Sequence, residues 1–350
     1  MGTTVARATI RDVARLAGVS DGTVSNTLNR PHLVNPETRD RVRQAMATAG
    51  YVPNAAARAL RVGRTRTIGL VVLDFGNPFF TDVATGAEQA ATDAGADLAL
   101  SGTGTGRHDR EDRLLRHLAE RRLDGLIITP NTVDHPLLAT IEQRGTPVVV
   151  LAREVPGRRH SAVRSDDRLG GELAARHLLD HGHRHLAFVG WRRDERYDGA
   201  ARTVAAAGAA LDWIDAGDAG ITGGLTAGAA LTALAPESRP TAVFCANDLI
   251  AAGLVQRITR AGLRIPGDVA VVGFDDTELA SAACAVELTS VHQPAAEIGR
   301  AAVRIILDEM TGPGRARQDI VFVPRLTVRE STAGQDGRGI RPAAASSPAS

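Results

Sequence analysis

The chain has 350 residues, 43% of them hydrophobic and 23% charged, values typical of a globular protein and not of a disordered or fibrous one. The length is sufficient for two or three domains. No apolar run is long enough to cross a bilayer, so we expect no membrane partner. The N-terminus lacks the apolar core of a signal peptide, and the two cysteines indicate no disulfide framework, so we expect a cytoplasmic protein.

The net charge of +1 hides a strong asymmetry along the chain. Residues 1–66 contain 11 arginines and 4 acidic residues, a net charge of +7, which leaves −6 on the rest. A basic segment attached to an acidic remainder indicates a polyanion partner for that segment alone. Every basic residue is an arginine, a side chain well suited to phosphate and guanine contacts.

The sequence after the N-terminal arm predicts two helices joined by a sharp turn. Thr9 can cap the first helix, and Ser20 can cap the second. Gly18 permits the turn between them because glycine adopts a positive φ at little cost. Val24 then points back at the first helix. The outward face carries Asp21, Gly22, Ser25, Asn26 and Asn29. This pattern favours a helix-turn-helix that enters the DNA major groove, with an ordinary helical hairpin as the alternative.

A third helix is expected from Asn35-Pro36, which combines a capping residue with proline at the first helical position, and it should end at Gly50. After Tyr51-Val52-Pro53 comes a short alanine-rich segment, Asn54 to Leu60, and then a basic linker. The short segment is not expected to be a stable helix by itself. It can instead order on binding.

From Thr67 onward, strand-like apolar runs alternate with helical stretches, and the pattern restarts after Asp166. This order predicts two consecutive doubly wound parallel sheets with a ligand cleft between them. The expected strands are Ile68–Leu73, Leu98–Leu100, Gly125–Thr129, Val148–Leu151, Leu186–Val189, Ala242–Cys245 and Val269–Phe274. The expected helices are Ala84–Ala94, Arg110–Arg121, Leu137–Arg144, Gly170–His181, Gly223–Leu234 and Leu249–Ala261.

Several motifs in the right order resemble the lactose/galactose repressor family of bacterial transcription regulators, over nearly everything from Thr9 to Thr332. They are Asp12-Val13-Ala14, Ala17-Gly18-Val19-Ser20, Thr23-Val24-Ser25, Tyr51-Val52-Pro53-Asn54, Ala57-Arg58-x-Leu60, Asp166, His177-Leu178, Gly182-His183-Arg184, Arg196-x-x-Gly199, Asn247-Asp248, Gly273-Phe274-Asp275-Asp276, Gln293-Pro294 and Arg329-Glu330-Ser331-Thr332.

The resemblance implies an N-terminal all-α helix-turn-helix head and an α/β body like a periplasmic binding protein, with two doubly wound parallel-sheet subdomains. It also implies a homodimer and three crossings between the subdomains, near 163–166, 289–293 and 319–324. The expected parts are the head at 1–53, a hinge helix and linker at 54–66, an N-subdomain at 67–165 plus 291–320, a C-subdomain at 166–290 plus 321–332, and a disordered tail at 333–350.

For DNA, the resemblance implies base contacts from Asp21, Gly22 and Asn26. Asn26 can pair with adenine, and Asp21 can accept from cytosine or merely favour the helix N-terminus. Gly22 departs from the family, which usually has a base-reading side chain there. The other implied DNA contacts are Thr9, Ser20, Thr23, Ser25, Asn29, Asn54, Ala57, Arg58, Leu60 and Arg61. Leu60 resembles the family's apolar wedge, which kinks the duplex at a central base step; the alternative is a linker residue that rests on the body.

For a small-molecule effector, the resemblance implies contacts from Asn77, Phe79, Asp166, Arg196, Asn247, Asp275 and Gln293. Carboxylates, amides and a guanidinium suit a polyhydroxylated ligand such as a sugar or a sugar derivative. Ala219 stands where many relatives have a stacking aromatic, so Phe79, or with less support Trp191, would have to serve.

The favoured function is a ligand-responsive repressor of carbohydrate-utilisation genes that binds a pseudo-palindromic operator as a dimer. Three alternatives stay open: a purine or protein corepressor acting on the same architecture, a solute-binding protein, and a sugar- or nucleotide-modifying enzyme. No catalytic group of residues supports an enzyme. No cofactor or metal is expected, because His181-x-His183-x-His185 lies between a helix and a strand, where His183 suits a structural role.

Overall fold

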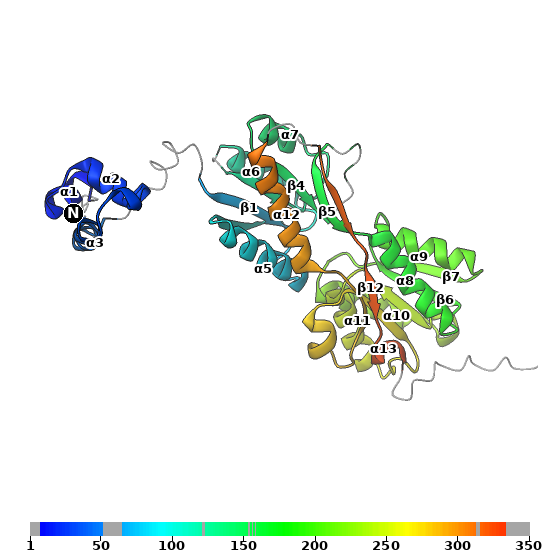
Figure 1. The fold of residues 1–350 in the computed structure, drawn as a ribbon. Coiled ribbons are helices and arrows are strands. Elements are labelled where there is room, and N and C mark those ends of the chain that lie inside the picture. The colour runs from blue at the N-terminus through cyan, green and yellow to red at the C-terminus, as the bar shows by residue number, and fades with distance from the viewer. Residues whose placement is uncertain are drawn as a thin grey trace, which may run out of the picture. The chain divides into compact units, whose positions relative to one another are not determined.

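The computed structural model describes residues 8–51, 65–120, 123–152, 155, 157, 159–312 and 316–333. The chain forms two compact units, residues 1–65 and 66–350. We call the described part of the first unit the head and that of the second unit the body, and each is described by itself (Figure 1).

The head consists of three α-helices and one 3₁₀ turn. Their bounds are Ile10–Ala17 (α1), Asp21–Asn29 (α2), Pro31–Leu33 (η1) and Pro36–Ala49 (α3). The small core contains Val13, Ala14, Ala17, Val24, Val42 and Ala45, all buried. The expectation of a three-helix head with Val24 turned toward the first helix is therefore confirmed.

The head helices begin and end at the residues that the sequence indicates. Thr9 and Asp12 form a capping box, since the backbone N–H of each residue donates to the side chain of the other. The Thr23 N–H donates to Ser20 Oγ at 3.1 Å. Gly18 ends α1 with a φ of 65°, and Gly50 ends α3 with a φ of 59°, both in the left-handed region.

The body contains two six-stranded sheets, ordered β11-β5-β4-β3-β1-β2 and β12-β10-β9-β8-β6-β7. All pairs are parallel except β10–β12. The strands are Thr67–Val72 (β1), Asp97–Gly102 (β2), Gly125–Ile128 (β3), Val148–Leu151 (β4), Ser161–Ser165 (β5), His185–Gly190 (β6), Ala210–Asp215 (β7), Ala242–Cys245 (β8), Ala270–Asp275 (β9), Thr289–His292 (β10), Asp319–Phe322 (β11) and Arg325–Thr327 (β12).

Helices cover both faces of each sheet, as expected of a doubly wound fold. They are Pro78–Asp93 (α5), His108–Glu120 (α6), Pro136–Gln143 (α7), Asp167–Asp180 (α8), Glu195–Ala206 (α9), Ile221–Ala233 (α10), Asp248–Arg260 (α11), Ala295–Thr311 (α12) and Glu330–Ala333 (α13). In the first sheet, α5 and α12 pack side by side on one face and α6 and α7 on the other (Figure 1). In the second sheet, α8 pairs with α9 and α10 with α11.

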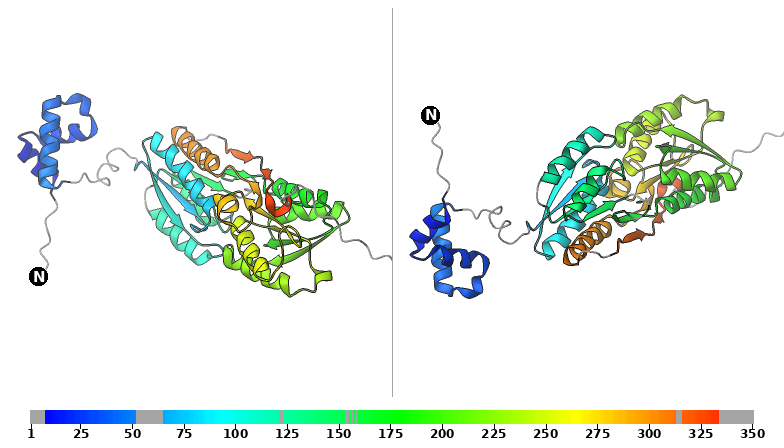
Figure 2. Two further views of the ribbon diagram at one scale, coloured as in Figure 1. Left: turned by 90° about the horizontal axis from the view of Figure 1, so that it is seen from below. Right: turned by 90° about the horizontal axis from the view of Figure 1, so that it is seen from above.

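We call the first sheet with its helices the N-terminal lobe, and the second sheet with its helices the C-terminal lobe. The chain passes from one lobe to the other after β5, between β10 and α12, and between β11 and β12. Figure 2 shows the last of these passages, where the orange-to-red segment continues from one lobe into the other. Strand β10 ends at His292 in the second sheet and β11 ends at Phe322 in the first. These strand ends lie two residues after the expected boundaries at 290 and 320 and inside the expected crossings near 289–293 and 319–324.

Most expected elements agree with the structure within a few residues, but α5 begins at Pro78 and not at Ala84, because Asn77 caps it. Sequence periodicity missed β5, α9, β7, β10, α12, β11, β12 and α13. Strand β7 has largely exposed or half-buried side chains, so its apolar signal is weak. No described helix is long and apolar enough to cross a membrane.

Candidate DNA-binding surface and ligand cleft

Helix α2 places its polar residues on the outside of the head. Asp21, Gly22, Asn26 and Asn29 are exposed, and Ser25 is half-buried. Val24 and Thr27 on the opposite side are buried and hold the helix against the head core. This face is therefore presented to solvent on a rigid support, which is the arrangement that groove recognition needs.

Contacts within the head distinguish the members of this face. Asp21 lies 3.7 Å from Arg11 of α1, in an ion pair that is exposed to solvent. The Asn29 amide folds back and donates to the Ser25 carbonyl oxygen at 2.8 Å. Thr9 and Ser20 cap their helices, and Ser20 Oγ also lies 3.0 Å from Thr23 Oγ1. Their side chains therefore position α1 and α2.

The predicted hinge contacts Asn54, Ala57, Arg58, Leu60 and Arg61 lie outside the described residues. Their assignment to DNA stays a prediction from the sequence.

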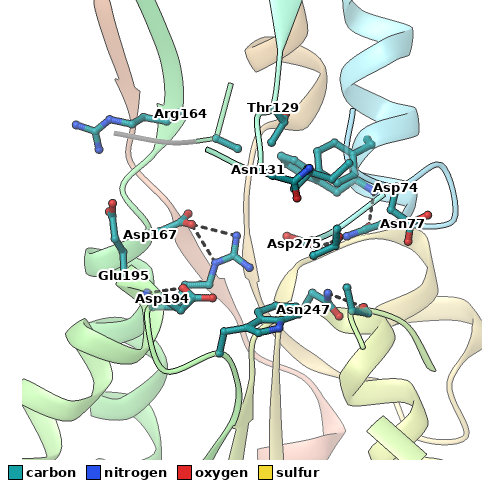
Figure 3. A pocket seen from close by; sticks show the side chains of 18 of the residues that line it. Asp74, Asn77, Thr129, Asn131, Arg164, Asp167, Asp194, Glu195, Asn247 and Asp275 are labelled. Atoms are coloured by element: carbon teal, nitrogen blue, oxygen red, sulfur yellow. Dashed lines mark hydrogen bonds and ion pairs between the residues drawn. The ribbon is translucent and has the colours of Figure 1, made fainter. Parts of the chain in front are cut away.

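In the body, a cavity of about 410 Å³ lies between the two lobes. Its walls are formed where the strands end, at their carboxyl ends, the usual place for ligands in open parallel sheets. Asp74 follows β1, Thr129 follows β3, Trp191 follows β6, and Asn247 follows β8. Side chains from both lobes face one another across this cleft (Figure 3).

Arg196 is held rigidly in the C-terminal wall of the cleft. Its Nε donates to Asp167 at 3.1 Å, and its Nη2 lies 3.0 Å from the same carboxylate oxygen. Nη1 donates to the Ala246 carbonyl, and the guanidinium lies 4.0 Å from the centre of the Phe274 ring. A planar donor fixed on several sides can present its remaining N–H groups to a ligand in one orientation.

Asp275 connects the two lobes across the cleft. It is only 4% exposed and accepts from Gln293 at 2.7 Å and from Asn77 of the N-terminal lobe at 3.2 Å. Burial raises the pKa of Asp275 to about 7; Arg196 opposes this rise, and Asp248 adds to it. Its φ of 103° is in the left-handed region, a strain of about 1–3 kcal/mol that the hydrogen bonds around it hold in place.

Five of the seven predicted effector contacts line the cleft: Asn77, Phe79, Arg196, Asn247 and Asp275. The other two do not. Asp166 instead caps α8, where its Oδ1 accepts from the Leu169 N–H at 2.9 Å, and the next residue, Asp167, lines the cavity. Gln293 is buried behind Asp275 and donates to that carboxylate. The place of both residues differs from the sequence prediction. A one-residue offset at the start of α8 turns Asp167 and not Asp166 toward the cleft, and Asp275 stands between Gln293 and the cavity.

Several cleft residues were missed. They are Asp74, His108, Thr129, Asn131, Arg164, Asp167, Arg193, Asp194 and Glu195. The signal that could have found some of them is position, since Asp74, Thr129 and Asn131 follow within three residues of a strand end. Asn131 also accepts from the Gly106 N–H and donates to the Gly104 carbonyl oxygen, which fixes the glycine-rich loop against the cleft.

Both aromatic candidates, Phe79 and Trp191, line the cavity, but they differ in how deeply they are buried. Phe79 is 4% exposed and packs edge-on against Phe80, so most of its surface belongs to the core of the N-terminal lobe. Trp191 is half-buried. The Ala219 carbonyl oxygen accepts from the Asn247 amide at 2.9 Å, at the position that carries no aromatic side chain.

The His181-x-His183-x-His185 motif has structural partners. His183 Nδ1 lies 2.9 Å from Thr241 Oγ1, and His185 Nε2 lies 2.8 Å from Asp212. Burial lowers the pKa of His183 to about 4, so its ring is neutral near pH 7. His181 Nδ1 lies 2.8 Å from its own helix, at the His177 carbonyl oxygen. The three rings therefore have separate partners.

Two known family models match this chain, one in the head and one in the body. Residues 9–54 match the model of bacterial regulatory proteins of the lacI family, and residues 175–332 match that of the periplasmic binding protein-like domain. The HTH-type transcriptional repressor PurR of Aliivibrio fischeri (strain MJ11) is 35% identical over 332 residues, which cover 93% of this chain and 98% of that protein.

Two solved structures extend the likeness to the whole fold. A transcriptional regulator CelR–cellobiose complex is 32% identical with a TM-score of 0.68, over 93% of this chain and 100% of that one. The lac repressor dimer bound to operator and the anti-inducer ONPF is 25% identical with a TM-score of 0.78, over 93% and 99%. The chain therefore belongs to the lacI family of bacterial regulatory proteins and is a DNA-binding transcriptional repressor of that family.

Proposed function

We propose that the protein binds a pseudo-palindromic operator as a homodimer in the cytoplasm and that a carbohydrate in the body cleft controls this binding. The observation that carries the DNA half is the exposed polar face of α2, supported by a buried Val24 on the other side. Asn26 reads a base, while Thr9, Ser20 and Thr23 set the position of the helices on the phosphates. Two such heads on one dimer match the two half-sites of a palindrome.

The proposed division of the chain follows the sequence. Residues 54–66 act as a hinge between head and body, and Leu60 inserts at the operator centre. The effector changes the closure of the two lobes, and operator affinity changes because the two closure states differ in their affinity for DNA.

The carbohydrate proposal rests on the polar groups of the cleft. Carboxylates and amides from both lobes can accept from and donate to neighbouring hydroxyls, and Arg196 supplies fixed donors. One relative of known structure is the transcriptional regulator CelR in complex with cellobiose, a sugar. A purine effector is the second candidate, favoured by the PurR relatives. Ala219 supplies no aromatic face, so the ring of a sugar or of a purine would have to stack on Phe79 or Trp191, which also line the cavity.

The test is a selection of genomic fragments with the purified full-length protein at fixed salt, followed by mapping of the half-sites. Recovery of one pseudo-palindrome, with lower affinity and loss of DNA bending in Leu60→Ala, is expected. Equal binding to all fragments with only a salt-dependent affinity would mean that the head is a general anion-binding patch.

A further inference from the structure

The charge that a ligand can carry in the cleft depends on the helices whose N-termini lie there. A helix N-terminus normally attracts anions, because its first N–H groups lack partners within the helix. Four helices of the body, α5, α8, α9 and α11, have a capping residue that lines the cavity or directly precedes a lining residue, and α6 begins with His108, which also lines it. They are therefore the places where a phosphate or carboxylate group of a ligand would be expected to bind.

The N-termini of α5, α8, α9 and α11 already donate to a capping side chain of their own. Asn77 accepts from the Phe79 N–H at 2.9 Å, and Asn247 accepts from the Ile250 N–H at 2.8 Å. Asp166 and Asp194 cap α8 and α9 in the same way, each at 2.9 Å. Two of the four caps are carboxylates, which bring a negative charge to the position that a ligand anion would take.

The walls of the cleft also carry more acidic than basic side chains. The described lining residues include five carboxylates and three guanidinium groups; the carboxylates belong to Asp74, Asp167, Asp194, Glu195 and Asp275, and the guanidinium groups to Arg164, Arg193 and Arg196. Arg196 is paired with Asp167 inside the cleft, and Arg164 lies 3.3 Å from Asp319 of the neighbouring strand. Much of the positive charge of the lining is therefore already compensated by the protein.

Asp275 adds to this effect from the centre of the cleft. Burial raises the pKa of Asp275 to about 7, which means that the site holds even its own carboxylate charge weakly. A further anion beside it would meet the same shortage of compensating charge. A hydroxyl group, in contrast, can donate to Asp275 or Asn77 and accept from Arg196 without bringing charge into the cleft.

Building on the carbohydrate-responsive function proposed above, we propose that the cleft excludes anionic ligands and that the effector is an uncharged polyhydroxylated compound, free of phosphate and carboxylate groups. The capped helix starts and the acidic walls together make the cleft a site for neutral sugars and not for sugar phosphates, sugar acids or nucleotides.

The experiment is calorimetric titration of the full-length protein with three matched pairs: ribose and ribose 5-phosphate, glucose and glucose 6-phosphate, and inosine and inosine monophosphate. Hypoxanthine, cellobiose and further uncharged mono- and disaccharides are titrated beside them. In any pair that binds, the affinity of the uncharged member should be at least about thirty times that of its phosphorylated partner. The reason is that the phosphate brings about two negative charges close to the carboxylates. Equal or tighter binding of a phosphorylated member would overturn the proposal. So would the absence of binding by every uncharged compound tested.

A matched pair of variants tests the electrostatic cause. Asp194→Asn keeps a good capping side chain on α9 but removes a charge from the cleft wall, so the preference for the uncharged member should fall about threefold to tenfold. Asp198→Asn removes a charge from the exposed side of the same helix α9, at a residue that does not line the cavity, and should leave the preference nearly unchanged. An equal effect of the two would contradict the proposal.

The outcomes separate this inference from the function on which it rests. Binding of hypoxanthine but not of inosine monophosphate or of any sugar would refute the carbohydrate effector while leaving the exclusion of anions intact. Preference for a sugar phosphate would refute the exclusion of anions while leaving the carbohydrate effector intact. Operator binding by the ligand-free protein, measured in the same preparation, tests the DNA-binding proposal independently of either.

Discussion

The side-chain amide of Asn77 in the N-terminal lobe donates to Asp275 in the C-terminal lobe across 3.2 Å, between residues 198 positions apart in the chain. The same Asn77 caps α5 through its Oδ1, and the same Asp275 accepts from Gln293 at the crossing between β10 and α12. One hydrogen bond thus joins a helix start, a strand end and an interlobe crossing (Figure 3). Closure of the lobes around a ligand would act directly on this contact.

Two substitutions at Asn77 separate its roles. Asn77→Ser keeps a capping oxygen but is too short to reach Asp275, so the free energy of unfolding should change little while the effector concentration that half-releases operator DNA shifts several-fold. Asn77→Ala loses the cap as well and should be destabilised by about 1 kcal/mol. Thermal unfolding measures the capping role, and release of operator DNA at increasing effector concentration measures the interlobe role. An unaltered effector response in Asn77→Ser would show that the interlobe bond plays no part in control.

The ionisation of Asp275 makes the stability of the body depend on pH. Its folded pKa of about 7 lies above the ordinary value of 3.8, so the folded state holds the proton more tightly than the unfolded state. The contribution to stability is therefore full below about pH 4 and is lost as the pH rises through 7. Relative to Asp275→Asn, the wild type should lose about 1–3 kcal/mol of unfolding free energy between pH 5 and pH 8.

Chemical denaturation of both proteins at several pH values gives this difference directly. His177 and His183, whose pKa values burial lowers to about 4, change stability in the opposite direction, but they are the same in both proteins and cancel. A parallel pH dependence in the two proteins would show that Asp275 is ionised in the folded state throughout the range.

The two faces of α2 predict different failures. Asn26→Ala, on the exposed face, should leave the head folded and weaken operator binding by about 1–3 kcal/mol, with the loss confined to one base position of each half-site. Val24→Ala, at a fully buried position, should destabilise the head by roughly 2 kcal/mol and weaken binding to every sequence. Circular dichroism and binding to a set of single-base operator variants distinguish them. Uniform loss in Asn26→Ala would mean that it contacts only the backbone.

The close approach of α5 and α12 depends on glycine. A Cβ on Gly86 would lie 2.0 Å from the carbonyl oxygen of Ala296, and backbone atoms cannot move aside as a side-chain tip can. Gly86→Ala should therefore cost about 2 kcal/mol or more, although alanine is the better helix former. The neighbouring Thr85→Ala, at an exposed position, is the control and should change the unfolding midpoint little. Equal stabilities would mean that the helices can separate at no cost.

The elements that the sequence predicts well are those whose signals are local. Thr9, Ser20 and Asn35 mark helix starts because a side-chain oxygen satisfies N–H groups only three residues away. Buried strands such as β4 and β8 are short apolar runs, and the sequence becomes more polar on either side of each run. The alternation of such runs with helices is sufficient to predict two parallel sheets and a cleft at their strand ends.

The elements that were missed carry a mixed pattern. Strand β7 alternates between half-buried and exposed side chains, and α9 follows a polar stretch of arginines and acids. Whether such a segment becomes a strand or a helix depends on the sheet that receives it, which local periodicity does not report.

What the sequence by itself determined is the order of parts, a capped three-helix head and two α/β lobes, and the identity of five cleft residues, since these follow from spacing, residue type and motif. Only the tertiary structure decided that Asp167 and not Asp166 faces the cavity, that Gln293 acts behind Asp275, and that Asn77 reaches across to it. The reason is physical. Helix caps and strand periods depend on neighbours along the chain, whereas side-chain direction at a cleft and contacts over 198 residues depend on how separate elements pack.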